Sequence, residues 1–582
     1  MTAAFAPKID MQHKLFAELS TMFAQEVPMY DRSLLVNTIC NRAVCDLLGM
    51  MHGGFVMTDQ QLARTSGERH GAIRIGRPDE YRWIARFFAQ FGMQPHNYYD
   101  MSSIGEKSQP IVATAFRSVL QPEHRVFTSL LQTDYFDKAT QARIERVLAQ
   151  RQVFSDSAKS LIEKAETEGG LSWPDADRLV REGTTRIFKW TGTARDYPLY
   201  KELCDTGFKI AADIACFDRH HLNHLTPNTF CMDLYTSAMK MCMGKADESD
   251  FRSHAVRALT RMLTRGDGDF LRLTFRHLTP EVISSFKRAR PGAAEIDRLV
   301  DALTARLNQP DADMRALPHS GFKDITEGPS EDTPVFLRQD AYRALSEQVI
   351  FTNLDGSTVQ ATHTARFGEI EQRFYACTPE GRALYDRCLA AAEADPTLDS
   401  DLPTRDPVAY EAAYARHFAP FPKTLRELLA SGLVFGLYSA VERGAGGRTA
   451  HGSIDTVDLE QLLDRGFIKV EGLRYEDFLP VSAAGIFASN LNQYGTVSTA
   501  MARPKYTREK LEEVIGGPIV DVDALYRGQE AASILNTYAQ LGILDRVDAK
   551  TRERLNAAIE SMPMEARGEI ESELEHAAPA RG

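Results

Sequence analysis

The stretch that decides the fold is ERHGAIRIG, residues 68–76. Its apolar and polar residues alternate with a period of two, which predicts a β-strand. In a strand His70, Ala72 and Arg74 share one face, and the two isoleucines share the other, where they can pack against helices. The imidazole and the guanidinium suit a small dianion, with one end on a metal and the other in a bidentate arginine fork. The alternative is an amphipathic strand whose polar face is only solvated.

Helices and a second strand are predicted around this stretch. Apolar residues at three- and four-residue spacing predict helices in residues 13–27 and 31–51. Residues 77–93, RPDEYRWIARFFAQFGM, are predicted as a helix because proline and acids occupy the first turn. Residues 124–131, HRVFTSLL, are predicted to form a short apolar strand.

The rest of the chain is predicted to be mainly helical, with strands returning in residues 335–377. At 582 residues, two or more packed units are expected. Short strands alternating with helices make the fold class α+β. We divide the chain into N-terminal helices (1–60), a first core part (61–240) with a helical insert near 134–200, a helical insertion (241–316), a second core part (317–500) and C-terminal helices (501–582). Within the last two parts, residues 405–440 and 507–575 are predicted to be helical.

Composition excludes several classes of function. The net charge of −12 and the absence of a basic stripe argue against nucleic-acid binding. No uncharged apolar run of 18 residues is present, so no membrane-spanning segment is expected, and the N-terminus lacks the pattern of a secretory signal. The eight cysteines include no CxxC pair, which is typical of free thiols in a reducing cytoplasm.

A histidine cluster stands in RHHLNHLTP, residues 219–227, with His220, His221 and His224 inside five positions. One of them could hold a metal. Alternatively, the Thr-Pro pair could start a helix, leaving a capped cluster that leans towards the surface. HLTP recurs at residues 277–280 ahead of an apolar-periodic stretch, where a helix cap is a sufficient explanation. The spacing alone leaves both interpretations open at the first copy.

Two carboxylates stand on one face of a predicted strand in RFGEIEQRF, residues 366–374. Alternation puts Glu369, Glu371 and Arg373 on the same face. Either carboxylate could be a metal ligand, and Glu371 could instead pair with Arg373. The alternative is an edge strand with a solvated, charged face.

Together the three stretches suggest two histidines and one carboxylate on separate strands, the 2-His-1-carboxylate facial triad. Such a triad leaves positions open on a divalent metal, and non-haem Fe(II) oxygenases use them for a 2-oxo acid and O2. Structural zinc favours a closed tetrahedral shell, often with thiolates, and no suitable cysteine pair lies nearby.

Several segments carry a resemblance to a known family: RTSGERHGAIRIG, FTSLL, HLNHLTP, ARFGEIEQR with TPEGRALYD after it, and YEDFLPVSAAGIFASNL. With these the chain resembles the 2-oxoadipate dioxygenase/decarboxylase (D-2-hydroxyglutarate synthase) family of the vicinal oxygen chelate superfamily, over roughly residues 10–540. GEIEQR is also similar to the final metal-binding strand of 4-hydroxyphenylpyruvate dioxygenases, where the ligand carboxylate precedes Gln-Arg by two residues. That register selects Glu369 over Glu371.

The resemblance implies a role for each candidate residue. His70, His224 and Glu369 would be the metal ligands and catalytic residues, and Arg74 would hold the remote carboxylate of the substrate. Val481 and Ser482 would touch the substrate through their backbone. Of the remaining candidates, Glu371 and Arg373 would orient the triad, His220 and His221 would be its neighbours or surface residues, His277 would belong to a helix cap, and His363 is the main rival ligand.

The resemblance also implies the fold and the reaction. The fold would be a half-barrel of paired βαβββ modules around the metal, with helical N-terminal, inserted and C-terminal segments. The reaction would be the Fe(II)-dependent conversion of 2-oxoadipate and O2 to 2-hydroxyglutarate and CO2, in cytoplasmic lysine degradation. The alternatives are another metal-dependent enzyme on the same fold, a hydrolase or isomerase, and a metal-stabilised binding protein. The chain has Asn228 and Phe374 where the family pattern has arginine and glycine.

Overall fold

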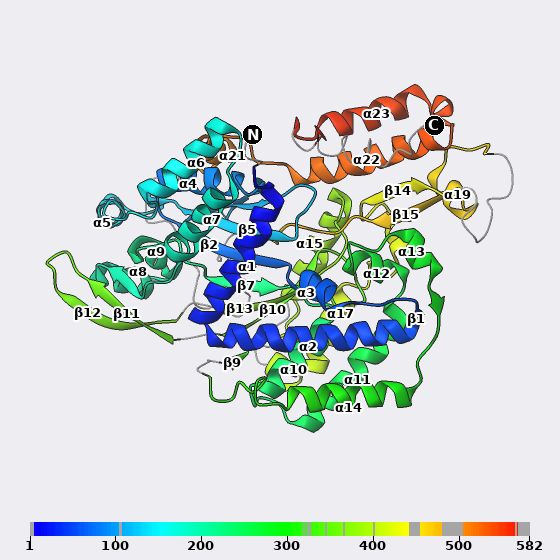
Figure 1. The fold of residues 1–582 in the computed structure, drawn as a ribbon, viewed down its shortest axis with the longest axis horizontal. Coiled ribbons are helices and arrows are strands. Elements are labelled where there is room, and N and C mark those ends of the chain that lie inside the picture. Colours follow the sequence, from blue (N-terminus) through cyan, green and yellow to red (C-terminus); the bar gives the residue numbers. More distant parts are fainter. Residues whose placement is uncertain are drawn as a thin grey trace.

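The computed structural model describes residues 5–103, 108–317, 321–322, 328–343, 346–364, 367–399, 402–441, 454–479, 505–564 and 567–568. Within these ranges it describes the backbone alone at residues 321–322, 340–343, 346, 364, 367–369, 403–404 and 407. Helices and small sheets alternate along the chain, so the predicted mixture of helix and sheet is confirmed (Figure 1).

The N-terminal helices form as predicted. Helices α1 (Lys8–Glu26) and α2 (Pro28–Met51) are followed by α3 (Asp59–Ser66), which begins with a capping box between Thr58 and Gln61. Among the described residues, α2 alone has the length and composition to cross a bilayer, although the sequence led us to expect no such segment. However, 56% of its most apolar window is buried, and α2 packs against α1, α10 and α14. These contacts are those of a core helix.

The predicted strand at residues 68–76 becomes the second-last strand of a five-stranded sheet. The sheet consists of β2 (Arg69–Ile75), β3 (Gln94–Asp100), β4 (Ile111–Arg117), β5 (His124–Leu131) and β7 (His224–Pro227), in the order β3-β4-β5-β2-β7. Strand β2 runs parallel to β5 and antiparallel to β7. Helix α4 (Pro78–Ala89) connects β2 to β3, as the proline and acids of its first turn predicted.

The two faces of this sheet differ as the alternation predicted. Ile73 and Ile75 are fully buried in the largest hydrophobic cluster, which includes residues of α1, α2 and α4. His70 and Arg74 lie on the opposite face, where His70 is 2% exposed and the Arg74 side chain 13% exposed. The alternative of a merely solvated polar face is therefore wrong.

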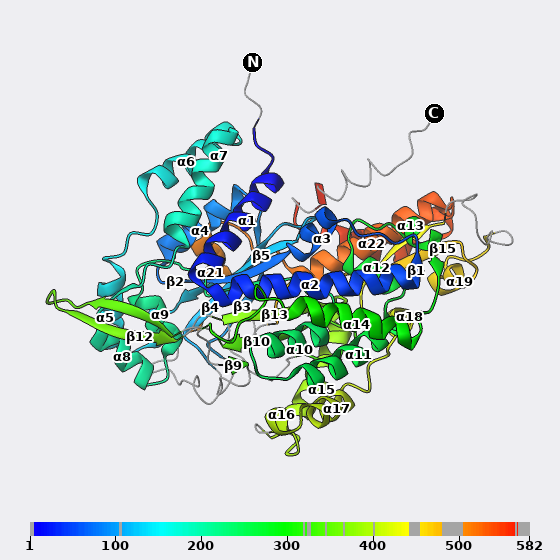
Figure 2. The same ribbon diagram turned by 60° about the horizontal axis from the view of Figure 1, so that its bottom comes forward.

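The strands predicted in residues 335–377 form two small sheets. Strands β9 (Gly321–Phe322), β10 (Leu337–Arg343) and β13 (Phe367–Arg373) make one, in the order β13-β10-β9. Its strand β13 meets β7 of the first sheet through a parallel bridge between Asn228 and Glu371. The other sheet consists of the hairpin β11 (Ser346–Thr352) and β12 (Thr358–Thr364) with β6 (Thr193–Arg195), and the hairpin projects from the body (Figures 1 and 2).

Helices cover these sheets. Residues 134–200 and 241–316 are mainly helical, as predicted, and the latter also contains the short strand β8 (Lys287–Arg288), which pairs with β1 (His52–Gly53). Between β5 and β9 lie η2 (Thr133–Tyr135), α5 (Lys138–Leu148), α6 (Asp156–Glu168), α7 (Trp173–Glu182), the π-helix η3 (Gly183–Ile187), α8 (Tyr197–Asp205), α9 (Lys209–Cys216), α10 (Met232–Cys242), α11 (Glu248–Arg265), α12 (Gly268–Thr274), α13 (Pro280–Ser285) and α14 (Ala293–Leu307).

The C-terminal part is largely helical as predicted, with one correction. It contains α15 (Pro379–Glu393), α16 (Leu402–Arg405), α17 (Pro407–His417), α18 (Leu425–Ala430), α19 (Leu459–Asp464), α21 (Arg508–Ile515), α22 (Val522–Gln540), η5 (Leu544–Arg546) and α23 (Ala549–Glu560). The helix predicted for residues 405–440 is wrong at its end, because β14 (Gly436–Ala440) pairs with β15 (Ile468–Gly472). The proposed division of the chain into five segments stays a prediction.

Candidate functional site

His70 and His224 face each other from adjacent strands. In the antiparallel register of β2 and β7, Ala72 lies opposite His224 and His70 lies opposite Thr226. The two imidazole rings are 5.4 Å apart between centroids, nearly perpendicular, and each histidine is 2% exposed. The first HLTP copy is thus a buried strand, and its interpretation as a capped cluster leaning towards the surface is wrong.

Glu371 reaches this pair from the neighbouring sheet. The bridge to Asn228 brings β13 alongside β7, and Oε1 of Glu371 lies 3.0 Å from Nδ1 of His70. The ring of Phe478 packs edge-on against the imidazole of His70, with 5.4 Å between the ring centroids. Residue 371 is 3% exposed, so the alternative of a solvated edge strand is wrong for this position.

Arg373 holds the Glu371 carboxylate in place. Its Nε donates to Oε1 at 2.8 Å, and one terminal nitrogen donates to Oε2 at 3.1 Å. Burial would raise the pKa of Glu371, but Arg373 and His70 together lower it well below its usual value. The carboxylate is therefore ionised, and it accepts from the guanidinium while it lies against His70.

The prediction that Glu369 is the carboxylate ligand stays a prediction. Its backbone pairs with Ala341 of β10, and its side chain lies outside the described residues. Val481 and Ser482 also lie outside them. Among the side chains that the structure describes, no three from histidine, cysteine, aspartate and glutamate gather closely enough to hold a metal.

The described part of the site fits two ligands of a divalent metal. A metal-binding imidazole commonly uses one ring nitrogen for the ion and points the other at a carboxylate, which fixes its tautomer and orientation. With Nδ1 at Glu371, His70 would use Nε2 for this purpose. His224 supplies a second imidazole beside it, and β13 passes close enough to supply an acidic ligand.

Arg74, two residues beyond Ala72 on the same face, belongs to a second buried group. One of its terminal nitrogens donates to Oδ2 of Asp213 at 3.1 Å. Oδ1 of the same carboxylate lies 2.6 Å from Nζ of Lys209 and 3.1 Å from Nε2 of His363. Since the His363 ring also stacks on Trp190, its contacts tie it to this group and not to the His70–His224 pair.

The other histidines of the cluster are buried. Nε2 of His220 lies 3.3 Å from Glu80, whose carboxylate also accepts two bonds from Arg151. His221 packs edge-on against Trp190. The surface alternative is therefore wrong for both histidines. In the second HLTP copy His277 is exposed, and Thr279 caps α13 by accepting from the Val282 amide, so the cap interpretation is confirmed there.

A buried network of charged side chains next to Glu371 was not predicted from the sequence. Arg125 of β5 is fully buried, and one of its terminal nitrogens donates to both Glu68 and Glu476. Another lies 3.7 Å from Glu371. The available signal was an arginine inside the apolar strand HRVFTSLL, since a buried arginine requires acidic partners.

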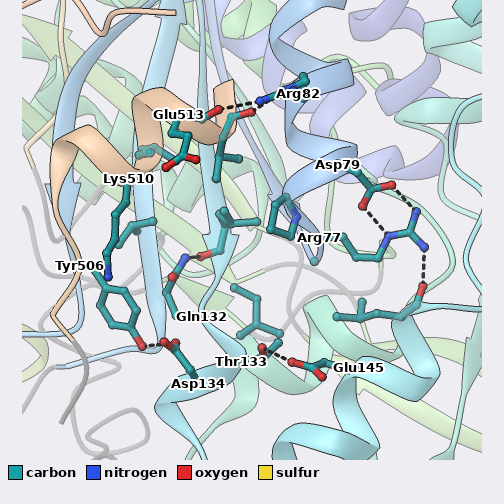
Figure 3. Close-up of a pocket in the computed structure, with 18 of the residues that line it drawn as sticks. Arg77, Asp79, Arg82, Gln132, Thr133, Asp134, Glu145, Tyr506, Lys510 and Glu513 are labelled. Carbon is teal, nitrogen blue, oxygen red and sulfur yellow. Dashed lines mark hydrogen bonds and ion pairs between the residues drawn. The ribbon is translucent and has the colours of Figure 1, made fainter. Parts of the chain in front are cut away.

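A cavity of about 990 Å³ lies beside the ends of β2 and β5, where Gly76 and Leu131 line it (Figure 3). It is lined by Val112 and Leu130, which share the face of Ile75. Polar side chains around it bond to one another: Arg77 to Asp79, Thr133 to Glu145, and Tyr506 to Asp134. His70, Arg74 and His224 do not line this cavity.

Comparison with known proteins gives concordant matches. The family described as 2-oxoadipate dioxygenase/decarboxylase matches residues 15–248 and 277–490. The 2-oxoadipate dioxygenase/decarboxylase of Pseudomonas putida is 33% identical over 89% of this chain and 94% of its own length. That of Escherichia coli (strain K12) is 30% identical over 90% of this chain and 97% of its own length.

A solved structure agrees with this assignment. The crystal structure of the hydroxyglutarate synthase from Pseudomonas putida in complex with 2-oxoadipate superposes with a TM-score of 0.64 at 30% identity, over 92% of this chain and 99% of that one. The family match covers most of the chain, and the relatives align over nearly their whole length. The chain therefore belongs to the 2-oxoadipate dioxygenase/decarboxylase family.

Proposed function

We propose that this protein is a non-haem Fe(II) dioxygenase that converts 2-oxoadipate and O2 to 2-hydroxyglutarate and CO2. The observation that carries the proposal is the buried pair His70 and His224, with Glu371 against His70 and Arg74 further along the same strand face. With O2 the reaction balances without a second keto acid, because the carbon lost as CO2 and the carbon that gains the hydroxyl come from the same molecule.

His70, His224 and Glu369 would hold the metal. When bound, Fe(II) would supply open positions for the keto acid and O2, together with the redox chemistry that joins them. The donor set favours iron over structural zinc, because two imidazoles and one carboxylate include no thiolate and leave coordination positions open.

The chain's own residues would fix the geometry of this site. Glu371 would keep the proton of His70 on Nδ1, so that Nε2 remains a lone-pair donor. Arg373 would keep Glu371 ionised, and it also donates to the backbone oxygens of Tyr475 and Asp477. The ring of Phe478 would exclude water from one side of His70.

Arg74 would bind the remote carboxylate of the substrate. An arginine that is 13% exposed in its side chain and bonded to Asp213 through one terminal nitrogen has further donors to offer. A 2-oxo acid without the second carboxylate would leave those donors unpaired at a cost in affinity. Val481 and Ser482 would touch the substrate through their backbone; the described residue Phe478, three positions earlier in the chain, packs on His70.

The fold would be a vicinal-oxygen-chelate half-barrel. In support, the chain order β2-α4-β3-β4-β5 is one strand, one helix and three strands, the order of a βαβββ module. The contact beside Asn228 joins β13 of the second sheet to the edge of the first sheet, at the strand that carries His224. The free thiols fit a reducing compartment, and we place the enzyme in the cytoplasm.

Oxygen consumption by the iron-loaded protein tests the proposal. We expect uptake of O2 with 2-oxoadipate, release of one CO2 for each O2, and 2-hydroxyglutarate as the product by mass spectrometry. His70→Ala and His224→Ala should abolish both iron binding and turnover. Release of CO2 without uptake of O2, or turnover that persists with zinc in place of iron, would rule the proposal out.

A further inference from the structure

The group around Arg74 contains more charges than a single substrate-binding arginine requires. Asp213, 3% exposed, lies between three basic side chains from three elements: Arg74 of β2, Lys209 of α9 and His363 of β12. Arg74 bonds to one oxygen of the carboxylate, and the other two bond to the second oxygen. The Asp213 carboxylate is thus shared among three partners, so its negative charge does not pair with Arg74 alone.

Lys209 is held firmly in this position. Its Nζ donates to Asp213 at 2.6 Å and to the hydroxyl of Tyr200 at 2.6 Å, and it lies 4.9 Å from the centroid of the Tyr200 ring. Its side chain is 18% exposed. A flexible lysine gains little from a surface ion pair, whereas a lysine fixed by two partners beside a buried carboxylate interacts strongly with it.

The charges can be summed at neutral pH. Burial would raise the pKa of Asp213, but Lys209, His363 and Arg74 lower it below its usual value, so the carboxylate is ionised. Burial lowers the pKa of His363, so this ring is neutral. Two positive charges and one negative charge leave the group with one positive charge. That excess matches one carboxylate of a ligand.

We infer that Lys209 is a specificity-determining residue for the dicarboxylate: by pairing with Asp213, it leaves the charge of Arg74 available to the remote carboxylate of the substrate. Without Lys209, Asp213 would neutralise Arg74, and this group of side chains would have no net attraction for an anion. Lys209 acts through Asp213 and Arg74, and it is therefore a positioning residue. This inference rests on the proposed function, in which Arg74 binds the substrate.

Anaerobic titration of the iron-loaded protein tests the inference without turnover. The two probes are 2-oxoadipate and 2-oxohexanoate, which have the same carbon chain and differ in the second carboxylate. We expect Lys209→Gln to reduce the preference for 2-oxoadipate, measured as the ratio of the two dissociation constants, by about tenfold. Affinity for 2-oxohexanoate should change little, which a general loss of structure would not produce.

Matched variants define the mechanism. Lys209→Arg should keep the preference, and Lys209→Gln combined with Asp213→Asn should recover much of it, because the excess charge returns. Lys201→Gln is the control, since Lys201 also pairs with an aspartate four residues later, Asp205, but both side chains are 60% exposed. The preference of this control should equal that of the unaltered protein.

The outcomes of this titration distinguish a failure of the proposed function from a failure of the inference about Lys209. If the unaltered protein binds both acids equally, the role that the proposed function gives to Arg74 is wrong, and the inference about Lys209 is overturned with it. If the unaltered protein prefers 2-oxoadipate while Lys209→Gln keeps that preference within twofold, the inference alone is overturned. The same holds if the double variant is no better than the single one.

Discussion

Glu369 and Glu371 are identical side chains two positions apart on one strand, and alternation alone could not distinguish their roles. The structure distinguishes Glu371 by its partners: Arg373 binds both of its oxygens, and His70 lies 3.0 Å from one of them. A carboxylate already engaged by a guanidinium is a poor candidate for a direct metal ligand. It is well suited to orient an imidazole that ligates one.

This assignment predicts different effects of the two amide substitutions. Glu371→Gln should retain iron with an affinity reduced by about 10–100-fold, because only the support of His70 is weakened. Glu369→Gln should lose iron, because a ligand is removed. Iron content after desalting and equilibrium titration with Fe(II) under argon measure both. Retention of iron by Glu369→Gln together with its loss from Glu371→Gln would move the ligand to Glu371.

At the residue scale, sequence reasoning predicted faces better than partners. The alternation in residues 68–76 correctly placed His70 and Arg74 opposite the buried isoleucines. It could not reveal that Arg74 pairs with Asp213, or Arg125 with Glu476, because these partners are 139 and 351 residues apart in the chain. Only the folded chain brings such charges together.

At the element scale, the same tetrapeptide adopts two structures. HLTP is a strand at residues 224–227 and the approach to a helix cap at residues 277–280. The local preferences are identical, so the surroundings decide: the first copy pairs with β2 inside the protein, whereas His277 and Thr279 of the second are exposed. Tertiary contacts override local propensity here, and a single sequence does not show them.

Two asparagines of helix α2 form hydrogen bonds with the segment that directly follows the strand of His224. Asn41, fully buried, donates to the backbone oxygen of Asn228 at 3.1 Å and accepts from the Phe230 amide at 3.0 Å. Asn37 donates to the same Asn228 oxygen. The departure from the family pattern at Asn228 therefore lies in this junction, where its own side chain donates to the backbone oxygen of Thr65.

We predict that Asn41→Ala lowers the free energy of unfolding by about 1–3 kcal/mol, because the Phe230 amide loses its acceptor and the Asn228 oxygen keeps only the bond from Asn37 among the described contacts. Iron affinity should fall as well, since the substitution loosens the segment that follows His224. Urea titrations and Fe(II) binding measure the two effects. Asn308→Ala is a control, because the side chain of this exposed asparagine bonds only to the Glu248 side chain among the described contacts. An Asn41→Ala protein as stable as this control would contradict the assigned role.

At the scale of the whole molecule, the sequence predicted the fold class and most helices but not how the sheets meet. Residues 436–440 were expected to be helical and instead form β14, which pairs with β15. The partner strand begins at Ile468, 28 residues after β14 ends, so the local sequence pattern could not reveal this pairing. The contact between β7 and β13 joins residues 228 and 371 across an intervening stretch that is mainly helical. Periodicity predicts strands, whereas pairing over such separations depends on the complete core.

The buried titratable side chains of the protein predict that its free energy of unfolding decreases in acid. Burial lowers the pKa of His96 to about 3 and that of His124 well below its usual value of 6.5. Between pH 6.5 and about 3 the unfolded chain therefore binds protons that the folded chain does not, and stability falls as pH falls. Glu476 adds to this below pH 4.5, because Arg276 and other arginines lower its pKa to about 2 against the effect of burial.

His124 offers the clearest test of this pH dependence, because its ring stacks on Phe16 at 4.3 Å and phenylalanine can take its place. His124→Phe should reduce the slope of unfolding free energy against pH by up to about 1.4 kcal/mol per pH unit between pH 6 and 4, since one titrating group is removed. Urea titrations across this range measure the slope. His254→Gln, on the exposed surface of α11, is the comparison variant. If His124→Phe had the same slope as this variant and the unaltered protein, the buried imidazole would not contribute to acid lability.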